Sequence, residues 1–354
     1  MNHCGATGSV NTGRLERSYP VDDRLRIARS QANLRDDEGR DYRRTRRVST
    51  TPLTELLRYY RRLTESGNSR LKAQLALAQQ LARKPNELVT LFTRSLAQFA
   101  RYSNPTQFFH EGELSGGRIA AAGEPLQDAC ATLISPPPVD IRRTVHFAQW
   151  VCETGNCEVT GRPELTFSYI DRELDCLRTS PGQLLEDGTN SKRAIVLDLL
   201  LENKMDATPI LAELKIRRDQ NAFYGLIQSL SAAAHLLTAS QRARLRNVYG
   251  LISVLRGNGP YLDLYVIFFE PEAKGLWPGV LKETIAVRDG LMRRAAITSM
   301  IRRIEFLHAA LGKKRLEFTL AEQILSKSVP APVQSDRSSK DPSPSVGDIC
   351  NYEE

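Results

Sequence analysis

Hydrophobic residues between positions 52 and 99 recur with the period of about 3.6 residues that marks amphipathic helices. Thr51-Pro52 is a helix-start signal, because proline is tolerated where the first amide has no partner, and leucines follow at helical spacing up to residue 65. The same period continues over 71–81 and again from Pro85 to residue 99. We therefore expect a small helical module at 49–110.

Glycine, proline and charge mark the ends of this module and of the chain. Residues 111–138 are rich in glycine and end in three prolines, which predicts a linker and a main boundary near residue 136. Residues 1–48 lack a sustained hydrophobic period and end in an arginine-rich run, so we expect a disordered basic arm there. Residues 327–354 are rich in Ser, Pro and Asp and are expected to be a disordered tail.

From residue 139 the pattern alternates between the helical and strand periods, which is typical of a mixed α/β domain. Strands are predicted around 165–169 and at 193–202, 209–216, 261–270 and 303–309, and helices around 145–151 and at 220–237 and 278–301. The segment 139–326 should therefore form an α/β domain with a mixed central sheet flanked by helices.

The hairpin predicted at 193–216 (RAIVLDLLLENKMDATPILAELKI) carries charged residues inside strongly apolar strands. Side chains two residues apart in a strand share a face, so Glu213 and Lys215 point to the same side of the sheet. The alternate positions of that strand are all apolar. We expect these apolar positions to form the core face, with the helix that begins near residue 220 packed on it.

The same hairpin brings a second carboxylate beside Glu213. If the chain turns at Met205-Asp206, Asp198 of the first strand lies directly opposite Glu213. Two neighbouring carboxylates repel unless a cation or a proton lies between them, and Mg²⁺ prefers oxygen ligands of this kind. A lysine on the same face, Lys215, would hold an attacking water or neutralise charge that develops on a phosphate.

With an acid on one strand and Glu-x-Lys on the next, followed by a helix, the chain resembles the PD-(D/E)XK nuclease superfamily over residues 139–310. Members of that superfamily often carry a glutamine on this helix about a dozen residues past the lysine, and Gln228 stands at a similar place. The resemblance implies a restriction-endonuclease-like fold and hydrolysis of phosphodiester bonds. It also implies that Asp198 and Glu213 bind Mg²⁺ or Mn²⁺, and that Lys215 and Gln228 complete the catalytic site.

Two features complicate the resemblance. The family frequently has another acid on a helix ahead of the hairpin, and Glu153, Glu164 and Glu173 are equally ambiguous candidates for it. The three-residue motif also occurs at Glu202-Asn-Lys204 and Glu272-Ala-Lys274. Only the copy at 213–215 lies inside an apolar strand, where burial of charge costs free energy unless the charge is paired or ligated.

Composition adds a bias toward a polyanionic partner. The 354 residues are 41% hydrophobic and 25% charged, enough to bury a sizeable core, and the net charge of +8 favours a polyanionic partner. The resemblance implies that this partner is nucleic acid, with DNA preferred over RNA. No stretch approaches the roughly 18 consecutive apolar residues of a membrane span, and residues 1–20 are polar. We therefore expect no membrane partner and a cytoplasmic location, or a nuclear one in a eukaryote.

Six cysteines in a chain of this length are too sparse for a disulfide scaffold and indicate a reducing compartment. A zinc site would draw on His146, Cys152, Cys157 and Cys176. This set lacks the two matched cysteine pairs that structural zinc sites usually show, so zinc is disfavoured.

Two alternatives to a nuclease remain open at this stage. The Glu213 and Lys215 pair would be a solvated ion pair if its sheet face were open to water. A nuclease-like or other α/β scaffold could also be non-catalytic, binding nucleic acid or a protein partner through the helical module. Basic residues after the hairpin would line a track for phosphates if the protein is a nuclease, and a solvated surface if it is not. They are Arg242, Arg244, Arg246, Arg293, Arg294, Arg302, Arg303, Lys313, Lys314 and Arg315.

Overall fold

The structure is a computed structural model. It describes residues 50–51, 54–65, 71–101, 109–110, 137–176, 184–185, 196–217, 219, 221–251, 259–271 and 277–328. The predicted basic arm (1–48), nearly all of the predicted linker (111–138) and the tail beyond residue 328 lie outside these ranges.

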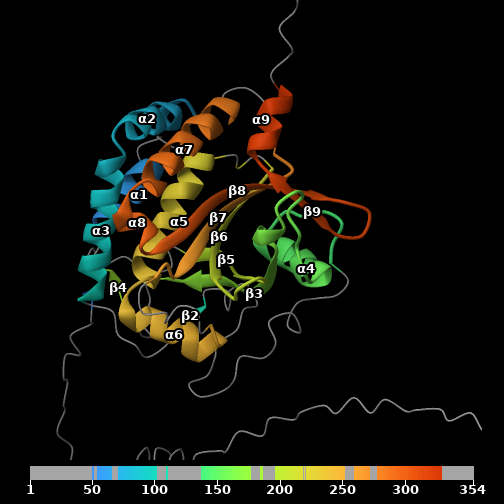
Figure 1. Ribbon diagram of the computed structural model, residues 1–354, viewed down its shortest axis with the longest axis horizontal. Helices are drawn as coiled ribbons and strands as arrows, with labels where there is room; N and C mark the ends of the chain where they lie inside the picture. The colour runs from blue at the N-terminus through green and yellow to red at the C-terminus, as the bar shows by residue number, and fades with distance from the viewer. Residues whose placement is uncertain are drawn as a thin grey trace, which may run out of the picture. The chain divides into compact units, whose positions relative to one another are not determined.

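A seven-stranded mixed sheet forms the centre of the fold, in the order β2-β3-β5-β6-β7-β8-β9 (Figure 1). Its strands are β2 (Phe109–His110), β3 (Phe167–Asp175), β5 (Val196–Asn203), β6 (Pro209–Ile216), β7 (Leu262–Phe269), β8 (Ile301–Leu311) and β9 (Leu316–Leu320). β6, β7 and β8 run parallel, and the remaining neighbours pair antiparallel. β1 (Thr50–Thr51) and β4 (Leu184–Leu185) form a separate parallel pair.

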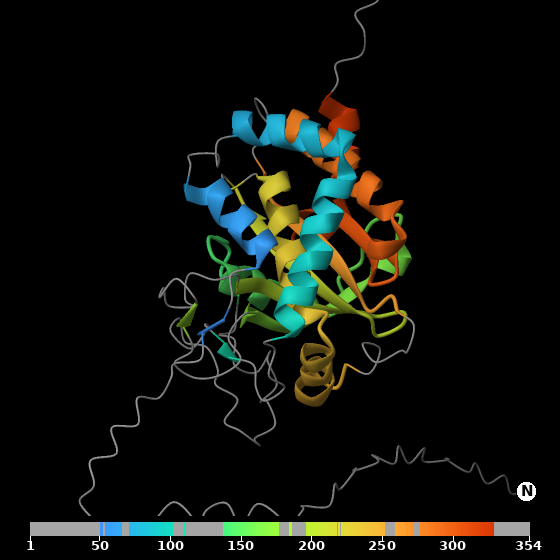
Figure 2. The ribbon, with the colours of Figure 1, turned by 90° about the vertical axis from the view of Figure 1, so that its left-hand side faces the viewer.

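Helices cover both faces of the sheet. The helices are α1 (Glu55–Glu65), α2 (Leu71–Arg83), α3 (Pro85–Ala100), α4 (Thr144–Thr154), α5 (Ala222–Leu236), α6 (Ala239–Tyr249), α7 (Trp277–Met292), α8 (Ala295–Thr298) and α9 (Glu322–Ser328), with a short 3-10 turn at Pro163–Leu165. α4 lies on one side of the sheet, while α5 and α7 lie on the other side (Figure 1). α1, α2 and α3 form an outer layer over α5 and α7 (Figure 2).

Each sheet face has its own hydrophobic cluster, and alternate residues of β7 contribute to the two clusters. Leu264 and Val266 belong to the cluster beneath α5, and Tyr265 and Ile267 belong to the cluster beneath α4. Because neither face is open to water, every residue of β7 is buried. Such continuous burial is typical of the central strands of sheets that are covered by helices on both faces.

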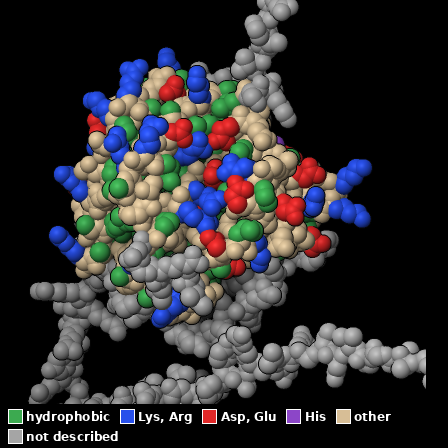
Figure 3. Space-filling view, in the orientation of Figure 1, with side chains coloured by type: hydrophobic (Ala, Val, Ile, Leu, Met, Phe, Trp, Pro, Cys, Tyr) green, Lys and Arg blue, Asp and Glu red, His purple; other side chains and the backbone are tan. Residues whose placement is uncertain are grey.

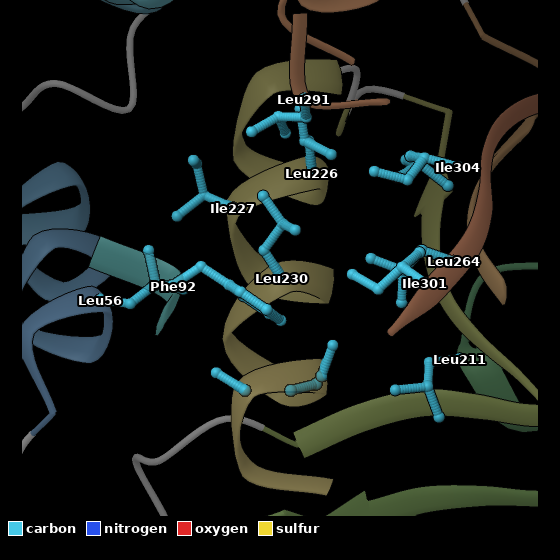
Figure 4. Packing of buried hydrophobic residues seen from close by; sticks show 14 of the residues in the cluster. Leu56, Phe92, Leu211, Leu226, Ile227, Leu230, Leu264, Leu291, Ile301 and Ile304 are labelled. Atoms are coloured by element: carbon cyan, nitrogen blue, oxygen red, sulfur yellow. The ribbon is translucent and has the colours of Figure 1, made fainter. Parts of the chain in front are cut away.

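Helix α5 lies in the middle of the larger cluster. Its Leu226, Ile227 and Leu230 lie between Leu56 and Phe92 of the outer helices and the residues of the sheet (Figure 4). The predicted helical module at 49–110 and the α/β segment therefore share one hydrophobic core.

Most of the predicted elements are present. The hairpin, the helix after it, the strand at 261–270 and the helical stretch at 278–301 correspond to β5, β6, α5, β7, α7 and α8. The mixed α/β class is confirmed, whereas β9, α6 and α9 were not anticipated. No helix in the described ranges is long and apolar enough to cross a bilayer.

One packing prediction is wrong. The helix after the hairpin does not pack on the all-apolar face of β6: Leu211 on the charged face belongs to the cluster with α5, while Ile210 and Ala212 belong to the cluster with α4. The alternation of β6 suggested one wet face, but both of its faces are covered, and seven of its eight residues are buried.

Candidate functional site

The β5 and β6 strands pair in the register that the sequence predicted. The antiparallel partners run from Glu202 opposite Pro209 to Leu199 opposite Ala212, and the same register continued by one residue places Asp198 opposite Glu213. Just past the last paired residues, the Leu214 amide of β6 donates a hydrogen bond to the side chain of Asp198, at Oδ2, over 2.9 Å. The carboxylate is thereby held at the end of the paired segment.

Glu213 and Lys215 form a buried ion pair. Their exposed fractions are 2% and 3%, and Lys215 Nζ donates to Glu213 Oε1 over 2.9 Å. The alternative of a solvated ion pair on an open sheet face is therefore wrong, because α5 covers that face. A buried ion pair requires close partners, because removing charge from water is costly.

Lys215 is surrounded by groups that suit a cation. Its ammonium donates to Gln228 Oε1 over 3.4 Å, lies 3.5 Å from Asp219 Oδ2 and lies 5.1 Å from the centre of the Tyr224 ring. Burial by itself would lower the pKa of Lys215, but the nearby carboxylates, Glu213 foremost, outweigh burial and raise the pKa above its ordinary range. Lys215 is therefore a fixed positive charge in this site.

The carboxyl groups of Asp198 and Glu213 lie close enough to share a proton, and both feel the charge of the Lys215 ammonium. Glu213 Oε2 is buried and receives no hydrogen bond from the described residues. Burial raises the pKa of Glu213 well above its ordinary value, the charge of Asp198 raises it further, and Lys215 offsets only part of the rise. Burial also raises the pKa of Asp198, against opposing effects of Lys215 and of hydrogen bonds that include one from Thr144 over 3.3 Å.

This arrangement fits a divalent cation. An unsatisfied buried carboxylate oxygen beside a second carboxylate is a hard, anionic donor set, and Mg²⁺ commonly uses only one or two protein carboxylates with waters and substrate phosphate. Within the described ranges, no group of three His, Cys, Asp or Glu side chains surrounds a possible metal position. A cation here would be held by Asp198 and Glu213, and its other ligands would have to come from water or substrate.

Of the three candidates for a further acid, Glu173 comes nearest to this pair in the strand register, because its β3 neighbours Arg172 and Leu174 pair with Leu199 and Leu197 on either side of Asp198. Glu164 pairs with Arg162 and Glu173 pairs with Arg172, while Glu153 lies at the far end of α4 from Thr144. Thr144, the first residue of α4, contacts Asp198 instead. Of the other Glu-x-Lys copies, Lys204 is exposed in the hairpin turn, and Glu272 and Lys274 lie outside the described residues.

Two of the basic residues named as a possible phosphate track are not available to a phosphate in the structure. Arg244 is buried, and Arg302 is bonded to Asp206 and Asp263, so neither presents a free cation to solvent. Exposed basic side chains remain at Arg246, Arg293, Arg294, Lys313, Lys314 and Arg315. On the face in Figure 3, Lys and Arg side chains are interspersed with Asp and Glu.

The cysteines do not form a zinc site in the described part of the chain. Cys157 and Cys176 are buried free thiols, and Cys152 is disulfide-bonded, so it cannot serve as a thiolate ligand.

Sequence reasoning missed two tyrosines at the site. Tyr224, on the first turn of α5, lies beside Lys215, and its hydroxyl donates to that of Tyr60 on α1 over 2.8 Å. Tyr60 falls within the helix that the sequence predicts after Pro52, and nothing in the sequence marks it as a site residue. No sequence pattern links it to a hairpin more than a hundred residues away, so this contact had no detectable signal.

Comparisons of the chain with protein-family models, with curated proteins and with solved structures found no match.

Proposed function

We propose that this protein is a metal-dependent nuclease that hydrolyses phosphodiester bonds, with DNA as the first substrate to test. The observation that carries the proposal is the enclosed trio itself: Glu213 and Lys215 are almost fully buried, and Asp198 adds a second negative charge beside them. Burial of two charged groups beside a third in a central hairpin costs stability, and a site with chemistry to perform is the simplest reason for it.

The order of elements supports the resemblance to the PD-(D/E)XK superfamily. The acid lies on β5, Glu-x-Lys lies on the adjacent β6, and α5 follows with Gln228 facing Lys215. A later strand, β7, and a later helix, α7, follow in the order that the superfamily has, which supports the proposal. A restriction-endonuclease-like fold is accordingly part of the proposal.

Asp198 and Glu213 would hold Mg²⁺ or Mn²⁺. When bound, the ion would supply Lewis acidity toward the phosphate and lower the pKa of a water. Thr144 and the Leu214 amide keep the Asp198 carboxylate in place by hydrogen bonds. Asp198 is only partly buried, so a phosphate would reach the site from its side.

Lys215 would act as a cation and not as a base, because its pKa is raised. In that state it can orient a water through its N–H groups and stabilise negative charge that develops on the phosphate. Gln228 accepts from the ammonium and fixes its direction. The net charge of +8 would favour the approach of a nucleic acid.

The test is incubation of the purified full chain with plasmid DNA, single-stranded DNA and RNA, each with Mg²⁺, Mn²⁺ or EDTA. We expect cleavage with a divalent ion and none with EDTA. Lys215→Ala and Lys215→Arg should each lower the single-turnover rate by about 10² to 10³, because a preorganised compact charge is lost or replaced by a planar guanidinium.

Lys204→Ala is the matched control, because Lys204 belongs to another Glu-x-Lys copy of the same hairpin and is exposed. It should cleave like the wild type. Equal rates for all Lys215 variants would reject a catalytic lysine. Absence of cleavage by the wild type under every metal condition would reject the nuclease and favour a non-catalytic binding protein.

A further inference from the structure

Two tyrosines connect the outer helical layer to the lysine of the site. The rings of Tyr60 and Tyr224 stack with their centres 4.9 Å apart and their planes inclined by 24°, and their hydroxyls are bonded over 2.8 Å. The Tyr224 ring in turn lies 5.1 Å from the Lys215 ammonium. The contacts thus run from α1 through α5 to β6.

Both rings have defined positions. The Asn221 side chain caps α5 by accepting from the Tyr224 amide over 3.0 Å, which fixes the first turn of the helix. Tyr60 packs against the larger hydrophobic cluster, and Glu213 and Asp198 are close enough to Tyr60 for their charges to act on its hydroxyl. The pair therefore borders the Lys215 side of the carboxylate site.

We propose that Tyr60 and Tyr224 position Lys215, which makes α1 part of the active site. The proposal rests on the nuclease function and assigns a role to the outer helical layer in it. A cation is attracted to the face of an aromatic ring, so the Tyr224 ring limits the positions that the ammonium can occupy. Tyr60 holds that ring by stacking on it and by accepting a hydrogen bond from the Tyr224 hydroxyl.

The experiment compares single-turnover DNA cleavage by the full-length wild type with Tyr60→Phe, Tyr224→Phe and Tyr224→Ala. The two phenylalanine variants keep the stacked rings but lose the hydroxyl bond, and we expect each to lower the rate constant about threefold to tenfold. Tyr224→Ala also removes the ring over Lys215, and we expect a loss of about 10² because small displacements of a catalytic group are costly. DNA affinity, measured by anisotropy in EDTA, should change less than twofold.

The double variant Tyr60→Phe/Tyr224→Phe separates positioning from general packing. If the two hydroxyls act only through their mutual bond, the double variant should be no slower than the slower single variant. Tyr59→Phe is the control, because Tyr59 lies on the same helix beside Glu87 and Arg62 of the outer layer. It should cleave at the wild-type rate.

The outcomes distinguish the two proposals. Wild-type rates in all three tyrosine variants, together with loss of cleavage in Lys215→Ala, would reject the positioning role and leave the nuclease intact. Parallel losses of rate and of thermal stability in Tyr60→Phe would reduce the tyrosine pair to a packing contact and also overturn the inference. An inactive wild type would reject the proposed function itself.

Discussion

At the scale of single residues, the site is governed by an imbalance of charge. Two carboxylates, Asp198 and Glu213, share one close ammonium in a region with little water. Without a cation, the crowding of negative charge shifts Glu213 toward holding a proton, as the direction of its raised pKa indicates. A divalent ion would replace that proton, so metal binding and proton release should be linked.

Stability should therefore respond to metal in a pH-dependent way. The folded-state pKa of Glu213 lies above its ordinary value of 4.5. Protonated Glu213 therefore makes its full contribution to the free energy of unfolding below pH 4.5, and this contribution is lost as the pH rises through the folded-state pKa. We expect Mg²⁺ or Mn²⁺ to raise Tm little at pH 5 and more at pH 8, as measured by calorimetry. In Glu213→Gln the metal effect should vanish, and an equal shift at both pH values would contradict the linkage.

The two acids should also differ in what their removal costs. Glu213→Ala deprives buried Lys215 of its closest partner, and we expect it to lower the free energy of unfolding by about 3 kcal/mol. Asp198→Ala removes a like charge from beside Glu213 and loses hydrogen bonds, so its net effect should stay within about 1 kcal/mol. Urea denaturation in EDTA measures the loss of stability in both variants. Equal losses would contradict the assignment of Glu213 as the close buried partner of Lys215.

At the scale of elements, the contact between α5 and the sheet sets the geometry of the site. Gly225 permits the close approach, because a Cβ there would lie 2.8 Å from Val266 Cγ1 and 3.2 Å from Lys215 Cε. Tyr224 and Gln228 sit on either side of this glycine along α5, and both contact Lys215. A small outward shift of α5 would thus move two neighbours of the lysine together.

Gly225→Ala should accordingly lower both stability and cleavage. We expect a loss of about 1 to 3 kcal/mol from overpacking, measured by urea denaturation, and a fall in the cleavage rate at temperatures where the variant remains folded. Gly279→Ala is a matched control on α7, since its Cβ would meet nothing closer than Leu75 Cδ1 at 3.7 Å. A similar loss of stability in both variants would show that the loss does not depend on the close contact at Gly225.

The elements of the site were predictable from sequence to different degrees. The register of β5 and β6 followed from placing the hairpin turn at Met205-Asp206, and the run at 261–270 was apolar enough to identify β7. The face that α5 covers was not predictable, because the alternation of β6 suggests one wet face, whereas the larger cluster covers it. Tyr60 was unpredictable because its bond to Tyr224 spans 164 positions.

At the scale of the whole molecule, α1 to α3 and the sheet belong to one core. Leu56→Ala in α1 should therefore lower the stability of the entire described fold by about 2 to 5 kcal/mol, because it leaves a cavity against α5. Unfolding followed by tryptophan fluorescence and by circular dichroism should remain one coincident transition. Two separate transitions, with only the helical one shifted, would show that the outer helices fold independently.

The enclosure of Glu213 with Lys215 also restricts how this chain can evolve. Replacing either residue alone leaves the other as an unpaired charge in the core, whereas replacing both by apolar residues of similar volume removes the problem. A descendant that no longer needs the site should lose the two charges together, with few viable single-step intermediates. A library varied at both positions and sorted for folded protein should accordingly be enriched in the charged pair and in doubly apolar pairs, and depleted of mixed ones.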